Sequence, residues 1–525
     1  MKNYKNILVL LSLVVLIASC SKSFVELNDP NRQTSGSYWN TSDDAIAGIN
    51  AVYSTLYYDA LYMRIYPWEM DVRADDMYNT SPWWITEVAV YTYTPGNPCY
   101  DFPWQYNYIG IFRANQVLTY VPDIKMDESL KTRILGEAKF LRGLFYYHLA
   151  ILYNNVPIIT TLPQGPDDYY PQQATDSAVW KQVISDFTDA ENMLPTKAAY
   201  SGTNNIGRAT KGAAAAFLGK SLMITKQWSK AEAVLKDIVD QKLGSYSLVP
   251  DYRDNFRSDP STENNSESLF EVQFDKTVGG TTLGWAGEPD ATWSKTSGKA
   301  RTYAPLPGFG YGDITPTDWI YLEFQKEKTV DSTNDPRMEA SLFFPHPGDT
   351  TYTVYGKTWA QANLTQRDGQ AYNVHVRKYL NDETDPDEIE WRSAINERIM
   401  RYSDVLLMYA ECLNELGRTG ESYQYIQEVR DRANLPDLAT KKPGMTQDQM
   451  RDQIAHERAL ELCFEAQRYT DILRWGWITN SDKRAMLEQH DPEFGQWTPG
   501  REIFPIPAAE LNSNKNLVQN PGWSN

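Results

Sequence analysis

Cysteine and histidine are scarce in this sequence, which holds only 4 Cys and 5 His among 525 residues. Lipidation of Cys20 would leave three cysteines, and an odd number gives no disulfide framework. His456 and Glu457 begin a zinc-protease motif, but Leu460 stands where the second histidine ligand is required. The sequence therefore predicts neither a disulfide-stapled scaffold nor a metal site, and we expect no cofactor.

Positive charge is also in short supply. The chain has 50 Lys and Arg against 68 Asp and Glu, a formal net charge of −18. Nucleic-acid binding depends on Lys and Arg that neutralise phosphates, so the charge balance excludes a nucleic-acid partner. Docking on anionic lipid by charge is disfavoured for the same reason. Apolar residues make up 42% of the chain and charged residues 22%, which predicts a folded body long enough for two or three ordinary domains.

Recognisable catalytic motifs are missing. The sequence GKS at positions 219–221 lacks the earlier glycine of a phosphate loop, and no serine lies in a nucleophile elbow. Glu457, Glu461 and Glu465 follow at four-residue spacing, and a glycan-cleaving enzyme needs two carboxylates across a sugar. Ion pairs that tie this helix to its neighbour are the favoured interpretation of the three glutamates. We therefore expect a protein that is not an enzyme.

No hydrophobic run is long enough to span a bilayer. The run from Ile7 to Ile17 follows two lysines and is typical of a secretion signal. Small residues then precede Cys20, as in the cleavage box of bacterial lipoproteins. The sequence predicts a signal peptide over residues 1–19 and lipid attachment at Cys20. Several acyl chains there would anchor the protein firmly to a membrane, because stable attachment needs more than one chain.

What the sequence does contain is helical periodicity. From Ile399 to Leu416 the apolar residues recur at spacings of three and four, so they share one helix face, and Gly417 is placed to end that helix. A second helix is expected from Glu421 to about Ala433, and a third from about Gln447 to Trp475. A similar helical hairpin is expected over residues 210–240. Paired helices with short turns are typical of tetratricopeptide-type units.

The remaining segments are less regular. Short strands are expected at residues 269–274, 338–344, 351–355 and 373–380. The predicted fold is mainly α, a tetratricopeptide-like scaffold of helical hairpins with large irregular loop insertions and a few short β-strands. The predicted organisation is an N-terminal helical region over 20–242 with a loop insertion at 60–102, and a C-terminal region over 243–525. The second region carries a loop-rich insertion at 277–317 and a helical bundle at 399–475.

Aromatic residues are abundant, with 34 Tyr and 16 Trp. Two irregular segments concentrate rings that follow no helical or strand period and lie beside polar residues. Sugars offer C–H groups to ring faces and hydroxyls to amides and carboxylates, so such loops are typical of glycan-binding surfaces. The alternative, that the rings pack the loops onto the scaffold, stays open for each of them. The candidate glycan-binding residues are Trp83, Trp84, Trp285, Trp293, Tyr303, Phe309 and Tyr311.

Four segments carry a resemblance to a known family. They are GEAKFLRGLFYYHLAILYNNVPII from Gly136, RATKGAAAAFLGKSLM from Arg208, HERALELCFEAQRYTDILRWG from His456, and FPIPAAELNSNKNLVQNPGW from Phe504. In this order they resemble the SusD/RagB family of glycan-binding outer-membrane lipoproteins. The resemblance extends over nearly the whole chain and implies a SusD-like fold.

The resemblance also implies a function. Such a protein is lipid-anchored in the outer membrane, faces the cell exterior, and binds oligosaccharides or polysaccharides without cleaving them. It delivers them to a partner, a TonB-dependent transporter of the SusC type. One alternative from another class is a tetratricopeptide-type lipoprotein that faces the periplasm and binds proteins. A glycan-cleaving enzyme is the third hypothesis.

Overall fold

The computed structural model describes residues 38–200, 202, 205–277, 295–382 and 393–523. The predicted signal peptide, Cys20, Trp285 and Trp293 lie outside the described residues. Within the described ranges, each helix is either too short or not apolar enough to cross a membrane.

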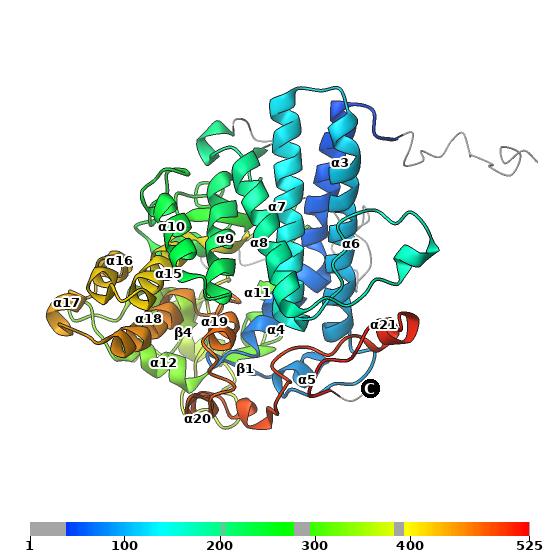
Figure 1. The fold of residues 1–525 in the computed structure, drawn as a ribbon. Helices are drawn as coiled ribbons and strands as arrows, with labels where there is room; N and C mark the ends of the chain where they lie inside the picture. Colours follow the sequence, from blue (N-terminus) through cyan, green and yellow to red (C-terminus); the bar gives the residue numbers. More distant parts are fainter. Residues whose placement is uncertain (1–37, 201, 203–204, 278–294, 383–392, 524–525) are drawn as a thin grey trace, which may run out of the picture.

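Long helices packed side by side form one half of the molecule (Figure 1). The longest contacts the helices on both sides of it, and its second half is almost completely buried. Side-chain caps fix where these helices begin; Thr41 and Asp44, for example, form a capping box at the first of them. The four helices are α3 (Ser42–Ser54), α6 (Pro98–Tyr120), α7 (Glu128–Tyr153) and α8 (Asp176–Met193).

Helical hairpins continue the scaffold on the other side of α8. Each helix packs against the next, and Gly219 permits the closest approach, since a Cβ there would lie 2.6 Å from Leu235. This arrangement confirms the predicted mainly helical fold with tetratricopeptide-like hairpins. The helices are α9 (Lys211–Ile224), α10 (Trp228–Val239), α15 (Tyr402–Glu415), α16 (Thr419–Arg432) and α18 (Gln447–Leu462).

The predicted helix over 399–416 is correct at its end and wrong at its start. Gly417 has φ +76°, and the amide of Arg418 donates to the carbonyl of Leu413 (2.9 Å), so the helix ends in a left-handed turn as predicted. Its first residues belong instead to a strand, β8 (Glu397–Arg401), which pairs antiparallel with β2 (Ser268–Val272).

The third predicted helix, from Gln447 to Trp475, is interrupted. α18 ends at Leu462 and α19 (Arg468–Arg474) follows after a break in which Phe464 and Ala466 have positive φ. Their amides donate to the carboxylates of Asp76 (3.3 Å) and Asp71 (2.8 Å). Contacts with a segment far away in the sequence therefore replace the helical hydrogen bonds at this point.

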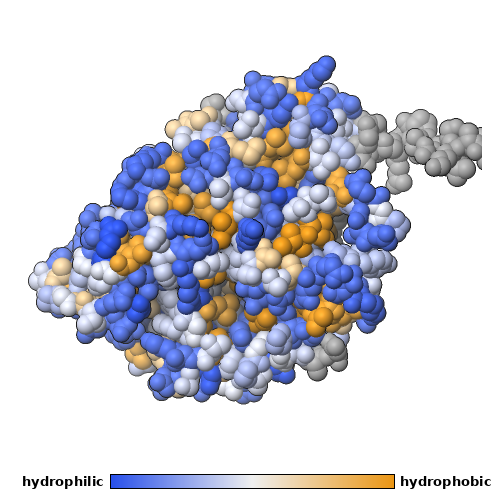
Figure 2. Space-filling model, viewed as in Figure 1, coloured by the Kyte–Doolittle hydropathy of each residue, from blue (hydrophilic) through white to orange (hydrophobic). Residues whose placement is uncertain are grey.

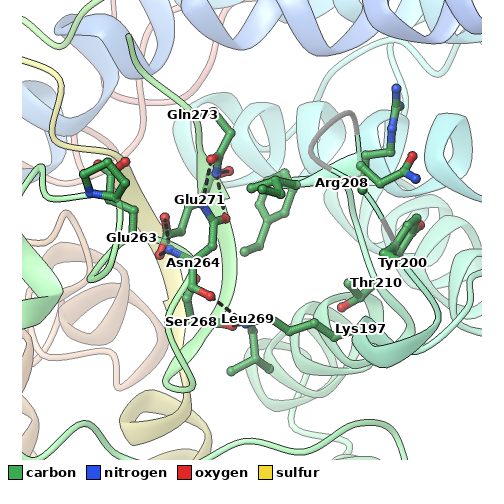
Figure 3. Close-up of a pocket in the computed structure, with 16 residues that line it drawn as sticks. Lys197, Tyr200, Arg208, Thr210, Glu263, Asn264, Ser268, Leu269, Glu271 and Gln273 are labelled. Atoms are coloured by element: carbon green, nitrogen blue, oxygen red, sulfur yellow. Dashed lines mark hydrogen bonds between the residues drawn. The ribbon is translucent and has the colours of Figure 1, made fainter.

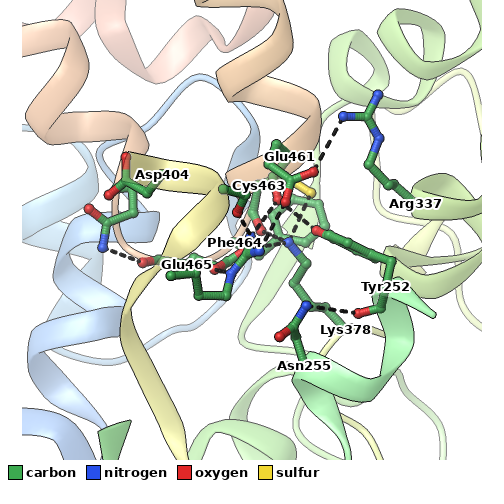
Figure 4. A network of polar contacts seen from close by, with 12 residues as sticks. Tyr252, Asn255, Arg337, Lys378, Asp404, Glu461, Cys463, Phe464 and Glu465 are labelled. Carbon is green, nitrogen blue, oxygen red and sulfur yellow. Dashed lines mark hydrogen bonds and ion pairs between the residues drawn. The ribbon is translucent and has the colours of Figure 1, made fainter. Parts of the chain in front are cut away.

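The same break lets buried charged groups meet. Glu465, which lies between the two positive-φ residues, forms an ion pair with Arg401. It forms another with Lys378 (Figure 4). On the other side of the break, Arg468 binds Asp75 with its guanidinium (2.6 Å). The C-terminal helices are thus fastened to residues 71–76 by several buried polar contacts.

Within the described residues, the strands are short and make four two-stranded antiparallel sheets. The predicted strand at 269–274 is confirmed as β2, whereas residues 338–341 of the predicted strand 338–344 belong to the helix α13. The other pairs are β1 (Met77–Asn79) with β3 (Ile314–Pro316), β4 (Leu342–Phe343) with β7 (His375–Val376), and β5 (Thr353–Val354) with β6 (Lys357–Thr358).

The segments predicted as irregular contain short elements. Residues 60–102 hold two short α-helices, a strand and the start of α6, so the prediction of a wholly irregular insertion is wrong. The short α-helices of the chain are α4 (Ile65–Asp71), α5 (Ile85–Ala89), α11 (Lys299–Tyr303), α12 (Asp318–Gln325), α13 (Pro336–Ser341), α14 (Trp359–Ala362), α17 (Leu438–Lys441), α20 (Ser481–His490) and α21 (Ala508–Ser513). Single turns are η2 (Thr55–Tyr57), η3 (Asp59–Met63), η4 (Val121–Asp123), η5 (Pro166–Tyr169), η6 (Lys197–Ala199), η8 (Tyr252–Phe256) and η9 (Pro492–Gln496).

One large cluster of buried hydrophobic residues joins both halves, with members from Ala45 to Leu517. On the face drawn in Figure 2, hydrophobic residues at the surface form separate small patches among polar residues.

Candidate ligand-binding surface

A short strand pair brings together the two aromatic segments that the sequence presents separately. β1 pairs with β3, and the pairing continues as the amide of Thr80 donates to the carbonyl of Asp313 (2.9 Å). The Thr80 hydroxyl also donates to the carbonyl of Gly312. Thr80 is thus held against residues 312–313, so the segment that leads to Trp83 and Trp84 meets the segment that follows Tyr311.

Trp83 and Trp84 stand on a turn that is fixed by side-chain hydrogen bonds. The Asn79 side chain accepts from the amide of Ser81 (3.2 Å), and the Ser81 hydroxyl accepts from the amide of Trp83 (3.3 Å). Asn97 donates to the carbonyl of Trp84 (3.1 Å). The two side chains are 62% and 44% exposed, with ring centroids 6.4 Å apart. The backbone is therefore ordered while the rings remain accessible.

Tyr311 is presented by a second ordered turn. Its side chain is 43% exposed, and its amide donates to the carbonyl of Arg301 (2.9 Å). The Arg301 guanidinium lies 4.4 Å from the tyrosine ring centroid. At Gly310 a Cβ would lie 2.6 Å from that of Ala304, so only glycine lets the turn fold this closely onto α11. We call Trp83, Trp84 and Tyr311 the aromatic platform.

Two predicted ring positions are wrong. Tyr303 is buried in α11, and its hydroxyl donates to Asp71 (2.7 Å). Phe309 is also buried and stacks on Tyr355, with ring centroids 5.0 Å apart. For these two rings the packing interpretation holds, because burial leaves no face for a ligand. Trp285 and Trp293 lie outside the described residues, so their assignment stays a prediction.

Asp313 links the two halves of the aromatic platform. It is buried, and burial raises the pKa of its carboxyl to about 6, although the Ser81 hydroxyl donates to it and favours the charged form. The Ser81–Asp313 hydrogen bond joins the residue two before Trp83 to the residue two after Tyr311. Asp313 therefore positions the rings and is too deeply placed to be a principal ligand contact itself.

The sequence interpretation missed how the platform is assembled. Neither the segment at 77–79 nor that at 314–316 shows the alternation of apolar and polar residues that is typical of a strand. Their pairing also joins parts of the chain that are far apart in the sequence. It also missed Leu306, an exposed side chain on the same turn as Tyr311. The Gly- and Pro-rich run over 305–312 was the available signal that this turn is exposed.

Glu457, Glu461 and Glu465, the three glutamates at four-residue spacing, all form ion pairs. The first two lie in α18 and the third in the break that follows it. Glu461 contacts Arg401 (2.9 Å), Arg432 (2.5 Å) and Arg337 (3.4 Å), and Figure 4 shows the last of these pairs. Burial opposes ionisation, but the three guanidinium groups outweigh it and hold the pKa of Glu461 far below its usual range. This confirms ion pairing between helices, since Arg432 lies in α16 and Arg337 in α13. The third partner, Arg401, comes from β8, and none of the three lies three or four residues from Glu461.

One group of possible metal donors exists within the described residues. Ligand atoms of Glu327, His456 and Glu457 lie within 4.8 Å of one another. The Arg430 guanidinium binds both Glu327 (2.6 Å) and Glu457 (2.5 Å), and Arg337 lies 3.6 Å from Glu457. These two cations already supply the positive charge that a metal ion would bring, so the arrangement fits an ion-pair network better than a metal site.

A polar pocket of about 500 Å³ lies between the 197–210 segment and β2 (Figure 3). The Lys197 ammonium donates to the carbonyl oxygens of Asn264 (3.1 Å) and Ser268 (3.2 Å). Asn264 and Gln273 exchange hydrogen bonds through their side-chain amides (2.7 and 3.0 Å). Because these groups satisfy one another, the pocket offers less to a sugar than the aromatic platform does.

Comparison with known proteins identifies the family. A model described as "SusD family" matches residues 266–523, and one described as "Starch-binding associating with outer membrane" matches residues 47–222. SusD-like protein P2 of Formosa agariphila is 26% identical over 541 residues, covering 100% of both chains. A SusD superfamily protein from Bacteroides vulgatus has a TM-score of 0.78 at 27% identity, covering 93% of this chain and 100% of that one. A structure titled "Laminarin binding SusD-like protein" has a TM-score of 0.75 at 26% identity, covering 92% and 100%. The chain belongs to the SusD/RagB family.

Proposed function

We propose that the protein binds oligosaccharides or polysaccharides, without cleaving them, at the aromatic platform of Trp83, Trp84 and Tyr311. The observation that carries this proposal is the junction of two ring-bearing segments through β1 and β3. Exposed rings on ordered turns can stack on sugar faces with little loss of conformational entropy. The Arg301 guanidinium, which lies 4.4 Å from the Tyr311 ring centroid, is a candidate donor to the hydroxyls.

Two comparisons support a carbohydrate ligand. The laminarin-binding protein named above shares 26% of its residues with this chain, and the N-terminal family description names starch. Laminarin and starch are both neutral glucans, which agrees with a chain of net charge −18, since an anionic polymer would be repelled. Neutral glucans are therefore the first ligands to test.

The location and the transporter partner are also part of the proposal. Lipid attachment at Cys20 would place the protein on the outer membrane, facing the cell exterior, in agreement with the family description that mentions this membrane. There it would pass the bound glycan to a SusC-like, TonB-dependent transporter. The partner is implied by family membership.

Binding without cleavage can be tested on the purified protein. We expect calorimetric titration with laminarin, starch and their hexasaccharides to give saturable binding for at least one of them. Chromatography of the same mixtures after prolonged incubation should show no new reducing ends. A hydrolase activity that copurifies with the protein, and that a substitution abolishes without unfolding it, would favour the enzyme hypothesis instead.

Membrane attachment should depend on Cys20. The variant Cys20→Ala is expected to leave the membrane fraction, because acyl chains on this residue are the proposed anchor. Fractionation followed by immunoblotting measures the change, and Cys99→Ala, which alters a buried cysteine, is the matched control. Continued membrane attachment of the Cys20 variant would contradict the lipoprotein assignment.

A further inference from the structure

A second groove, of about 1010 Å³, lies between α6, the loop over 154–175 that joins α7 to α8, and α21. In Figure 1 this loop projects beside α6, with α21 below it. We call it the side groove. Its lining contains no residue of the aromatic platform, and its volume is at the upper end of the range for small-molecule sites.

Three exposed aromatic side chains line the side groove. Tyr169 is 65% exposed, Tyr170 54% and Phe112 47%. Phe112 belongs to α6, whereas the two tyrosines lie at the end of η5, in the loop that joins α7 to α8. Rings from two separate elements therefore line the same groove.

The tyrosine wall is held in place by the C-terminal segment. The side-chain amide of Asn516 donates to the carbonyl of Tyr170 (2.6 Å), and that of Asn514 donates to the carbonyl of Pro171 (2.8 Å). The loop over 154–175 is thus fastened at its far end as well as at its helical ends. A pre-formed wall lowers the entropy that a ligand must offset on binding.

Polar groups suited to hydroxyls line the same groove. The side chains of Gln105, Gln116, Gln172 and Asp167 make no hydrogen bond or ion pair with any other described residue. Burial raises the pKa of Glu510, another lining carboxyl. Amides can both donate to and accept from sugar hydroxyls, and carboxylates can accept from them.

The charges of the groove restrict the class of ligand. Asp167, Asp168 and Glu510 contribute negative charge, and Arg113 is the one Lys or Arg among the described lining residues. An anionic sugar is therefore disfavoured. A protein partner is also disfavoured, because interface cores are depleted of charged residues, whereas here carboxylates lie among the rings.

We infer that the side groove is a second carbohydrate site, which binds a neutral oligosaccharide segment between Phe112 and the pair Tyr169 and Tyr170. This inference rests on the proposed function and extends it to a separate surface. A long glycan could engage the side groove and the aromatic platform together. Two linked contacts strengthen attachment beyond either alone.

Hydroxyl-radical footprinting of the purified full-length protein in detergent tests the site directly. Laminarihexaose and maltohexaose are the neutral probes, and a galacturonic-acid hexamer is the anionic one. We expect a neutral hexamer to protect Phe112, Tyr169 and Tyr170 from oxidation and the anionic hexamer not to. Protection should persist in the double variant Trp83→Ala/Trp84→Ala, because the groove shares no residue with the platform.

Affinity for long polymers provides an independent readout. The variant Tyr169→Ala/Tyr170→Ala is expected to bind laminarin or starch about tenfold more weakly, because one of two linked contacts is lost. Leu322→Ala, which truncates an exposed side chain on α12 outside both surfaces, should bind like the parent.

The outcomes separate this inference from the proposed function. Suppose that the unaltered protein binds a neutral glycan and that only the platform variants abolish this binding. If Phe112, Tyr169 and Tyr170 are then still oxidised at saturating hexamer, the side groove is not a carbohydrate site. Protection of those rings only by a copurifying protein would also overturn the inference. If the unaltered protein binds none of the neutral probes at either surface, the proposed function fails, and the inference fails with it.

Discussion

Trp83→Ala is expected to weaken glycan binding about tenfold or more while leaving the helical circular-dichroism signal unchanged. A ring fully covered by a sugar contributes roughly 1.5–3 kcal/mol of apolar contact, and about 1.4 kcal/mol corresponds to a factor of ten in affinity. Trp83 is the most exposed ring of the aromatic platform, so its removal should disturb the fold least. Calorimetry with the glycan that binds the unaltered protein measures the change.

Companion variants locate the effect on the platform. Trp84→Ala and Tyr311→Ala should each weaken binding as well, whereas Trp83→Tyr, which keeps a ring, should retain part of the affinity. Leu322→Ala again serves as the control for loss of an exposed apolar side chain. If all three alanine variants bind like the parent, the platform is not the site, and the protein-binding scaffold hypothesis gains support.

Arg401→Met should lower the free energy of unfolding by about 3–5 kcal/mol, the usual cost of removing one partner of a buried ion pair. The Arg401 guanidinium, fully buried at the end of β8, pairs with three buried carboxylates. Methionine keeps most of the length of the side chain but has no charge. The carboxylates of Glu267, Glu461 and Glu465 would therefore lose the partner that they share.

Denaturant titration followed by circular dichroism measures this loss. The matched control is Arg418→Met, because Arg418 is itself 39% exposed where it pairs with Glu421 (2.6 Å) and Glu232 (2.9 Å), and pairs of an exposed side chain contribute at most about 1 kcal/mol each. Equal losses for the two variants would show that the Arg401 network does not stabilise the fold as described.

Local patterns predicted the helical scaffold because its causes are local. The three-and-four spacing of apolar residues predicted a helix here, although every residue of α15 from Tyr402 to Asn414 is buried and not one face alone. Gly417 ends that helix because its position requires positive φ. The same reasoning selected Trp83, Trp84 and Tyr311, which are exposed, but also Tyr303 and Phe309, which are buried, so an irregular period alone does not show which rings are accessible.

Other features could not be predicted because their causes are distant in the sequence. The break between α18 and α19 depends on Asp71 and Asp76, which bind backbone amides almost four hundred residues later. Nothing in the local sequence around Phe464 marks that break. The burial of Tyr303 has the same origin, since its hydroxyl partner is also Asp71.

The link between residues 71–76 and the C-terminal helices has a consequence for biosynthesis. Arg468 is synthesised 393 residues after Asp75, a delay of roughly 20–80 s at 5–20 residues per second. Throughout that interval the acidic side chains near Asp75 lack the partners that neutralise them in the finished protein. The buried contacts of Asp75 with Arg468 therefore form only after the carboxyl-terminal segment is available, so these two distant segments complete this part of the fold together.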